Sequence, residues 1–247
     1  MAEIPYDSNL AQSGPVIGPH FCVSHLVHLL IDKKAFTLRS TRYLVTSADG
    51  NLMFKVKKFP LSFHGTLVVL DTSGNPVITL RPKKLTYHSR WQVFRGESTD
   101  DKDLIFSVKK SSRFQSNTKL DVFLASNTSE ENCDFKVEET HSDGSCDIFA
   151  GNSSTPIAQM DNKRTGSIFS RKDKLVVNVS PNVDYAMIVS LIIILDDFVS
   201  GSSPISTSID FSRKLIDRFL KFFAAVAHLH DGHARSPPVV ELRLSLE

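Results

Sequence analysis

The stretch that decides the fold is Tyr185–Leu195, which reads Tyr-Ala-Met-Ile-Val-Ser-Leu-Ile-Ile-Ile-Leu. On a helical wheel it is apolar on every side except at Ser190, and a helix without a polar stripe has to be surrounded by protein or by lipid. A membrane span needs about 20 apolar residues, whereas this stretch at about 1.5 Å per residue extends only roughly 16 Å. We therefore predict a helix that is enclosed within the protein.

Polar residues delimit the predicted helix. Pro181-Asn182 supplies a stop and an N-cap, and Asp184 suits the positive end of the helix dipole. We expect the Ser190 hydroxyl to donate to the carbonyl of Ala186, as buried mid-helix serines do. Asp196–Asp197 lie at the unfavourable end of the dipole, and so they should reach solvent or a basic partner.

Between residues 35 and 179 the sequence is typical of short strands separated by turns. Apolar and polar residues alternate along several of them, Leu104–Lys110 among them, and one dry face with one wet face indicates an antiparallel sheet. About twelve such strands can be counted. Four hairpins are predicted, each with Gly, Asn or Asp at the turn: Val45–Val56, Val68–Leu80, Trp91–Lys110 and Cys146–Met160.

Twelve antiparallel strands and one wholly apolar helix favour a specific arrangement. A wide barrel leaves interior space, and a helix of roughly 10 Å diameter can fill it. We predict a mainly β fold, a twelve-stranded antiparallel barrel around a central hydrophobic α-helix at about 183–199. The chain then divides into an N-terminal segment (1–32), the barrel with its helix (33–199) and an extension (200–247), in which Ile209–Ala227 can form a basic amphipathic helix.

Composition sets the broad class. Of the 247 residues, 41% are hydrophobic and 23% are charged, as in ordinary globular proteins. The three cysteines, Cys22, Cys133 and Cys146, form neither a CxxC pair nor an even disulfide set, which favours a reducing compartment. The N-terminus lacks the basic region of a secretory signal. We therefore expect a soluble, cytoplasmic protein.

The net charge of +2 hides a strong asymmetry along the chain. Lys33–Lys119 holds 17 Lys or Arg against 6 Asp or Glu, whereas Leu120–Val199 holds 6 against 13. This asymmetry suggests a basic face that meets an anionic partner. The alternative is that the strands merely place Lys and Arg on their solvent sides, because a split in sequence need not persist in space.

Seven segments of the chain resemble the plant LURP-one-related family over roughly Pro15 to Val199. They are 16–22 (Val-Ile-Gly-Pro-His-Phe-Cys), 49–56 (Asp-Gly-Asn-Leu-Met-Phe-Lys-Val), 70–84 (Leu-Asp-Thr-Ser-Gly-Asn-Pro-Val-Ile-Thr-Leu-Arg-Pro-Lys-Lys), 90–98 (Arg-Trp-Gln-Val-Phe-Arg-Gly-Glu-Ser), 133–137 (Cys-Asp-Phe-Lys-Val), 157–160 (Ile-Ala-Gln-Met) and 180–186 (Ser-Pro-Asn-Val-Asp-Tyr-Ala). Their order and spacing carry the resemblance.

The resemblance implies a tubby-like fold, which this family shares with tubby C-terminal domains and phospholipid scramblases. It also implies a link to plant defence and, by analogy, a membrane-tethered transcription-factor role. Tubby relatives bind phosphoinositides through basic surface residues, whereas the family brings no established catalytic residue set. The extension after Val199 is foreign to the family domain.

Motifs that carry chemistry are scarce. The chain has no P-loop, dinucleotide fingerprint, HExxH or GxSxG motif. The segment His228–His233 has metal-like spacing only, and nothing in the sequence brings Cys146 and His141 together as nucleophile and base. We therefore expect no catalytic residues, no metal and no cofactor, and a protein that is not an enzyme.

Three basic clusters at the ends of predicted strands form the candidate site. If equivalent strand ends converge in the barrel, these clusters make one lipid-binding patch, in which anionic lipid gains about 1 kcal/mol per basic residue. The clusters are Lys55, Lys57 and Lys58; Arg81, Lys83 and Lys84; and Lys109, Lys110 and Arg113.

The sequence thus predicts a non-enzymatic binding module for an anionic phospholipid (a phosphoinositide) or a protein partner. We expect a monomer in the cytoplasm, at the membrane periphery or in the nucleus. Two alternatives stay open. A nucleic-acid-binding or transcription-linked protein would use the same patch, although no aromatic residues are clearly interleaved with it for stacking. A lipid scramblase-like activity lacks the spanning helix that such a role would need.

Overall fold

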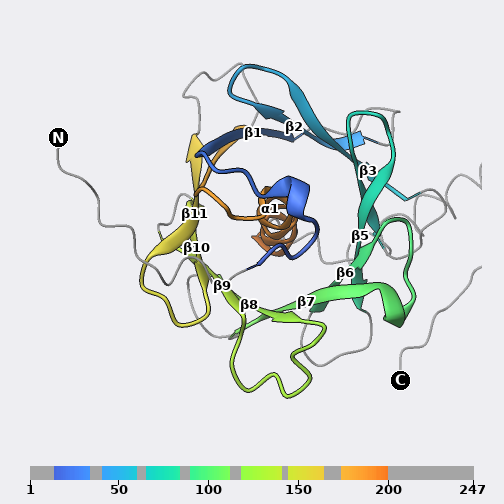
Figure 1. Ribbon diagram of the computed structural model, residues 1–247, viewed down its shortest axis with the longest axis vertical. Helices are drawn as coiled ribbons and strands as arrows, with labels where there is room; N and C mark the ends of the chain where they lie inside the picture. Colours follow the sequence, from blue (N-terminus) through green and yellow to red (C-terminus); the bar gives the residue numbers. More distant parts are fainter. Residues whose placement is uncertain are drawn as a thin grey trace, which may run out of the picture. The chain divides into compact units, whose positions relative to one another are not determined.

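Twelve strands close into one antiparallel barrel, and the helix α1 runs through its centre (Figure 1). The computed structural model describes residues 14–33, 41–59, 65–83, 90–111, 118–140, 144–163 and 174–199. The elements are β1 (Val27–Lys33), β2 (Thr41–Ser47), β3 (Leu52–Lys58), β4 (Leu67–Leu70), β5 (Pro76–Lys83), β6 (Arg90–Arg95), β7 (Leu104–Lys110), β8 (Lys119–Leu124), β9 (Phe135–Glu139), β10 (Cys146–Ala150), β11 (Pro156–Lys163), β12 (Lys174–Val179) and α1 (Tyr185–Val199), with short 3₁₀ turns η2 (Pro19–Phe21) and η3 (Asp101–Asp103). The predicted twelve-stranded barrel around a hydrophobic helix is confirmed.

The first and last strands close the barrel. Each strand pairs antiparallel with its neighbour in sequence, and β1 pairs with β12, with Val27 opposite Val179. Because every strand of the described barrel has two partners, it offers no free edge to another chain. β1 begins within the predicted N-terminal segment (1–32), six residues before the predicted barrel start. The extension 200–247, with the helix predicted at Ile209–Ala227, lies outside the described residues.

Alternation along the strands separates an apolar interior from a polar exterior. In β3, Phe54 and Val56 are buried in the interior, whereas Lys55 and Lys57 lie on the outer face. The four predicted hairpins are present as β2–β3, β4–β5, β6–β7 and β10–β11. Gly50, in the turn of the first hairpin, has a φ of +81°, a conformation that glycine adopts without steric cost.

The helix α1 is buried over most of its length. Every side chain from Ala186 to Leu195 is buried inside the barrel, and this enclosure explains why the segment needs no polar stripe. The Ser190 hydroxyl donates to the carbonyl of Met187 at 2.6 Å, one residue nearer than the predicted Ala186. No helix in the described part of the chain is both long enough and apolar enough to cross a membrane.

Asp184 caps the N-terminus of α1, and the prediction of an N-cap at Asn182 was wrong. Oδ1 of Asp184 accepts the backbone N–H groups of the second and third helix residues, both at 3.1 Å. Its Oδ2 accepts those of Ile17 (2.7 Å) and Gly18 (3.1 Å), so one buried carboxylate also ties the N-terminal segment across this end of the barrel (Figure 1). Asn182 instead takes a left-handed conformation, with φ 63°, in the turn before the helix.

Candidate anion-binding surface

Two parts of the barrel differ in charge, and β1, which holds one Asp and one Lys, lies between them on one side. The strands β2–β7, which we call the basic half-barrel, hold ten Lys or Arg and no Asp or Glu: Arg42, Lys55, Lys57, Lys58, Arg81, Lys83, Arg90, Arg95, Lys109 and Lys110. The strands β8–β12, the mixed half-barrel, hold Lys119, Lys136, Lys163 and Lys174 against Asp121, Glu138, Glu139, Asp147 and Asp161. Because β2–β7 are consecutive neighbours in the barrel, the asymmetry of the sequence persists in space.

Strand direction brings the described members of the three predicted basic clusters towards the same end of the barrel. β3, β5 and β7 run in one direction, since a single antiparallel strand separates each from the next. Their C-terminal lysines therefore lie at one rim. The helix α1 ends at this rim as well, where the Lys110 ammonium lies 5.4 Å from the centroid of the Phe198 ring. We call it the C-terminal rim.

The described members of these clusters differ in how far they are already engaged. Arg81 donates to the Thr99 carbonyl (3.1 Å) and to Oε1 of Gln92 (3.0 Å), so its guanidinium group is already engaged within the protein. Lys109 is paired with Glu130. Four lysines have no hydrogen bond or ion pair with any described residue: Lys55, Lys57, Lys58 and Lys83. Lys84 and Arg113 lie outside the described residues.

Three cations form a row across adjacent strands on the outer face. The register places Lys83 of β5 opposite Arg90 of β6, and Arg90 opposite Lys109 of β7. Like charges directly opposite each other on neighbouring strands destabilise a sheet. An anion beside the cation row (Lys83, Arg90 and Lys109) would therefore offset the repulsion between these three side chains.

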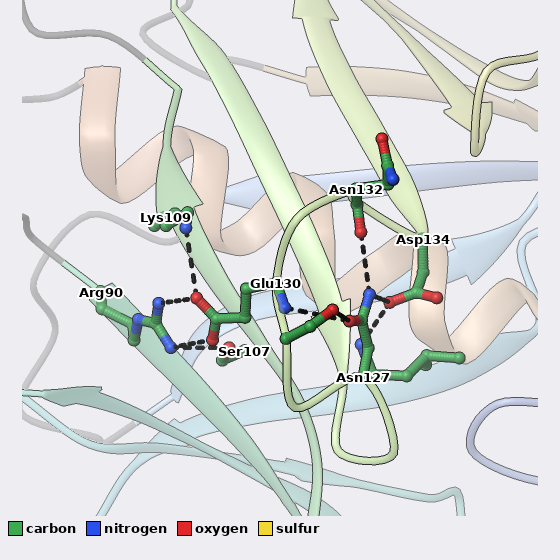
Figure 2. Close-up of polar contacts among 9 residues, drawn as sticks. Arg90, Ser107, Lys109, Asn127, Glu130, Asn132 and Asp134 are labelled. Carbon is green, nitrogen blue, oxygen red and sulfur yellow. Dashed lines mark hydrogen bonds and ion pairs between the residues drawn. The ribbon is translucent and has the colours of Figure 1, made fainter.

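Glu130 supplies that anion, as Figure 2 shows. Arg90 donates through Nη1 to Oε1 and through Nη2 to Oε2, both at 2.6 Å, and Lys109 Nζ donates to Oε2 at 3.2 Å. Arg90 Nη1 also donates to Oγ of Ser107 at 3.3 Å. These hydrogen bonds, from Arg90 above all and then from Lys109, lower the pKa of Glu130 to about 2, and Glu130 in turn raises that of Arg90.

Hydrogen bonds made by its own side chains stabilise the loop that presents Glu130, residues 125–134. Glu130 has a φ of 51°, a left-handed conformation that costs a non-glycine residue about 1–2 kcal/mol. Its N–H donates to Oδ1 of Asn127, whose Nδ2 donates to the Asn132 carbonyl (2.8 Å) and to Oδ2 of Asp134 (2.9 Å). Sequence reasoning missed Glu130, because no periodic pattern shows that a loop returns over the strands before it.

Carboxylates at the C-terminal rim hold the end of the helix. Asp196 accepts from Lys33 Nζ (2.9 Å) and from the Tyr43 hydroxyl (2.6 Å), and Asp197 lies 3.4 Å from Arg42 Nη2. The predicted basic partners are thus present. Burial raises the pKa of Asp197 to about 6, an effect that the nearby Arg42 only partly offsets. These cations serve the helix end rather than an external ligand.

An open hollow of about 1000 Å³ lies at the opposite end of the barrel, where α1 begins. Its walls include Arg95, Lys102, Asp103 and Asp134, which are of mixed charge. Arg95 already donates to the Ile17 carbonyl at 3.0 Å, and Asp134 accepts from the backbone N–H of Leu124 and from Asn127 Nδ2. This hollow therefore selects an anion less well than the basic half-barrel does.

The described residues carry little reactive chemistry. Cys146 is buried, and burial raises the pKa of its thiol, so that it is a poor nucleophile. His141 and the segment His228–His233 lie outside the described residues. Among those that are described, no three His, Cys, Asp or Glu side chains are grouped so that they could hold a metal ion.

Comparison with known proteins places this geometry in a family. Residues 27–196 match the model of the family described as LURP-one-related. The chain belongs to the LURP-one-related family. It is 47% identical over 185 residues to Protein LURP-one-related 15 of Arabidopsis thaliana, covering 74% of this chain and 85% of that one, and 48% identical over 181 residues to Protein LURP1 of the same plant, covering 73% and 87%.

A solved structure agrees with this assignment. The X-ray structure of an Arabidopsis thaliana protein, 40% identical, matches with a TM-score of 0.59 and covers 75% of this chain and 99% of that one. The range that matches the LURP-one-related model includes all twelve strands and α1 as far as Asp196. The basic half-barrel and the Glu130 loop are thus parts of the LURP-one-related domain itself.

Proposed function

We propose that this LURP-one-related protein is a non-enzymatic binding module that recognises anionic phospholipid through the basic half-barrel. One observation carries the proposal: six adjacent strands hold ten cations and no acidic residue. Lys55, Lys57 and Lys83 lie on the outer face and have no partner among the described residues. Each Lys or Arg near an anionic membrane surface contributes about 1 kcal/mol of attraction. A role in plant defence would then depend on recruitment to a membrane.

The aromatic residues favour a lipid surface over single-stranded nucleic acid as the ligand. Proteins that bind single strands stack bases on accessible aromatic side chains. Every aromatic residue in β2–β7 is buried: Tyr43, Phe54, Trp91, Phe94 and Phe106. A membrane surface requires only positive charge, which this half-barrel has.

Vesicle co-sedimentation of the full chain tests the proposal. We expect binding to phosphatidylcholine vesicles that contain 20% phosphatidylserine, and weaker binding as salt rises, because salt screens exposed charges. Changing Lys55, Lys57 and Lys83 together to Gln should weaken binding about 100-fold at low salt, at about 1 kcal/mol per residue.

The matched control removes the same charge from the mixed half-barrel. Changing Lys119, Lys136 and Lys174 together to Gln should weaken binding by less than about threefold. Equal losses in both triple variants would contradict a site in the basic half-barrel. Binding to duplex DNA at a salt concentration that abolishes vesicle binding would favour the nucleic-acid alternative.

A further inference from the structure

The cation row has more positive charge than its present partner neutralises. It places three cations on adjacent strands, and Glu130 brings one carboxylate. That carboxylate pairs with Arg90 and Lys109, while Lys83 is exposed and has no ion pair within the described ranges. The row therefore stays positive with Glu130 in place, and it can accept an anion of higher charge.

The geometry around Glu130 suits a phosphate group. Arg90 presents two nitrogens that grip two oxygens at once, and this fork fits phosphate as well as carboxylate. Lys109 reaches a carboxylate oxygen from the adjacent strand. Ser107 Oγ accepts from Arg90 and so keeps its own hydrogen to donate. A phosphomonoester, with a charge of about −1.5 to −2, matches three cations better than one carboxylate does.

Glu130 is placed so that a ligand can displace it. The Glu130 and Lys109 side chains are each 27% exposed, and that of Arg90 is 22% exposed, so solvent reaches the contact. The left-handed backbone at Glu130 is a strain that release of the loop would remove. We propose that the cation row is a binding site for a phosphomonoester, and that Glu130 occupies it as an intramolecular substitute until the phosphomonoester displaces it.

This proposal rests on the proposed function and makes it more specific. The ligand class is the phosphomonoester headgroup of an anionic lipid, and a free phosphomonoester shares the same chemistry. The competing interpretation is a permanent structural ion pair that only fastens the Glu130 loop to β6 and β7. The two differ in one respect: removing the Glu130 charge increases ligand affinity if Glu130 is a competitor, and leaves it unchanged if the pair is structural.

The test compares Glu130→Gln with Glu131→Gln in the full chain. Glu131 is exposed and adjacent in the same loop, so both variants change the net charge equally. The probes are phosphatidylcholine vesicles with 10% phosphatidic acid, which carries a phosphomonoester, and soluble glycerol 3-phosphate. We expect Glu130→Gln to bind the vesicles about tenfold more tightly, because the competitor no longer lowers the fraction of open sites. Glu131→Gln should change the affinity less than about twofold.

Besides an unchanged affinity of Glu130→Gln, three results of this comparison would overturn the proposal. The first is an equal gain in both variants, which would reflect net charge alone. The second is a gain that survives in the double variant Glu130→Gln/Arg90→Gln, since Arg90 is the main ligand contact. The third is an equal gain on phosphatidylserine vesicles or duplex DNA, whose phosphates are diesters. A gain in affinity for both the vesicles and glycerol 3-phosphate supports the site and shows that a free phosphomonoester is enough to bind it. A gain for the vesicles alone supports a site that binds the phosphomonoester only on a lipid at the membrane surface.

A measurement on the unaltered protein covers the case in which Glu130→Gln unfolds the loop. Saturating glycerol 3-phosphate should accelerate hydrogen exchange in residues 125–134, because the loop loses its anchor. Unchanged or slower exchange in the bound protein would overturn displacement. The outcome is also separable from that of the proposed function: failure of the protein to bind phosphatidylserine vesicles would refute the general membrane role and leave this site to be judged on glycerol 3-phosphate alone.

Discussion

Two carboxylates face an arginine in this barrel, and their surroundings give them opposite properties. Glu130, on the outer face, lies 2.6 Å from Arg90, and its pKa falls to about 2. Asp197, at the C-terminal rim, lies 3.4 Å from Arg42 with its side chain only 8% exposed, and its pKa rises to about 6. Close hydrogen bonds control the first, whereas burial outweighs the cation for the second. A nearby arginine thus lowers the pKa of a carboxyl group only where short hydrogen bonds or access to water also stabilise the charged form.

The largest effect should come from an interior carboxylate that has no cation at all. Ile193 is buried in the middle of α1, and Ile193→Asp would place a charge there with no partner. We expect this variant not to fold, because an unpaired buried charge costs more than the whole stability of a typical domain. Circular dichroism and size-exclusion chromatography check it. Ile193→Val is the control and should cost about 1 kcal/mol; a folded Ile193→Asp that merely changed its cellular location would contradict the enclosed helix.

Next in size is a buried carboxylate that is satisfied by N–H groups instead of a cation. Asp184→Ala removes the cap of α1 and leaves the N–H groups of Ile17 and Gly18 without their acceptor. Loss of a cap and of buried acceptors should lower the free energy of unfolding by about 3 kcal/mol. Urea denaturation measures it, with Asp184→Asn as a control that keeps an acceptor. A loss as small as that expected for a surface residue would show that the carboxylate is dispensable.

The pH dependence of stability sharpens the comparison at Asp197. Its pKa is about 6 in the folded protein, above the ordinary 3.8, so the folded state binds this proton more readily. The resulting stability is present below about pH 4 and is lost as the pH rises through 6. We expect a loss of about 2 kcal/mol over this range, measured by urea denaturation at several pH values. Asp197→Asn should make the free energy of unfolding nearly independent of pH in this range. An unaltered slope would show that Asp197 does not cause the pH dependence.

Glu130 should have the smallest effect on stability, and the pH dependence of this effect should be opposite in sign to that of Asp197. Its folded pKa of about 2 lies below the ordinary 4.5, so its contribution is present above pH 4.5 and is lost as the pH falls towards 2. Because solvent screens this outer pair, we expect only about 1 kcal/mol. Glu130→Gln should remove that much stability at pH 7 and none at pH 2, while Glu131→Gln should change neither value. A loss in Glu130→Gln that is independent of pH would mean that the side chain acts through packing alone.

The features that sequence could predict are those set by local pattern. Tyr185–Leu195 identified the buried helix because a helix that is enclosed by protein has apolar residues on all of its sides. The four hairpins followed from turn residues between alternating strands. The sequence left open whether the basic clusters meet; the barrel topology answers this for their described members, since alternate strands of an antiparallel barrel end together. That these clusters bind lipid stays a prediction.

The features that sequence missed depend on long-range contacts. Asp184 could not be chosen over Asn182 as the cap, because two of its four donors come from Ile17 and Gly18, more than 160 residues away. Nor could the sequence show that Arg81 is already engaged with Gln92 and Thr99. Glu130 reaches Arg90 only through a left-handed residue in an irregular loop, which has no periodic signature.

Pairing of β1 with β12 around α1 has a consequence for synthesis of the chain. The helix that fills the interior is made after all twelve strands. At about 5–20 residues per second, the ribosome needs roughly ten to thirty seconds to extend the chain from the end of β1 to the end of α1. The growing sheet lacks its last strand until Val179 has been made, and it lacks the helix that fills its interior throughout. A nascent chain arrested before Tyr185 should therefore stay sensitive to protease and bound to chaperones, and should be released only once the helix has emerged.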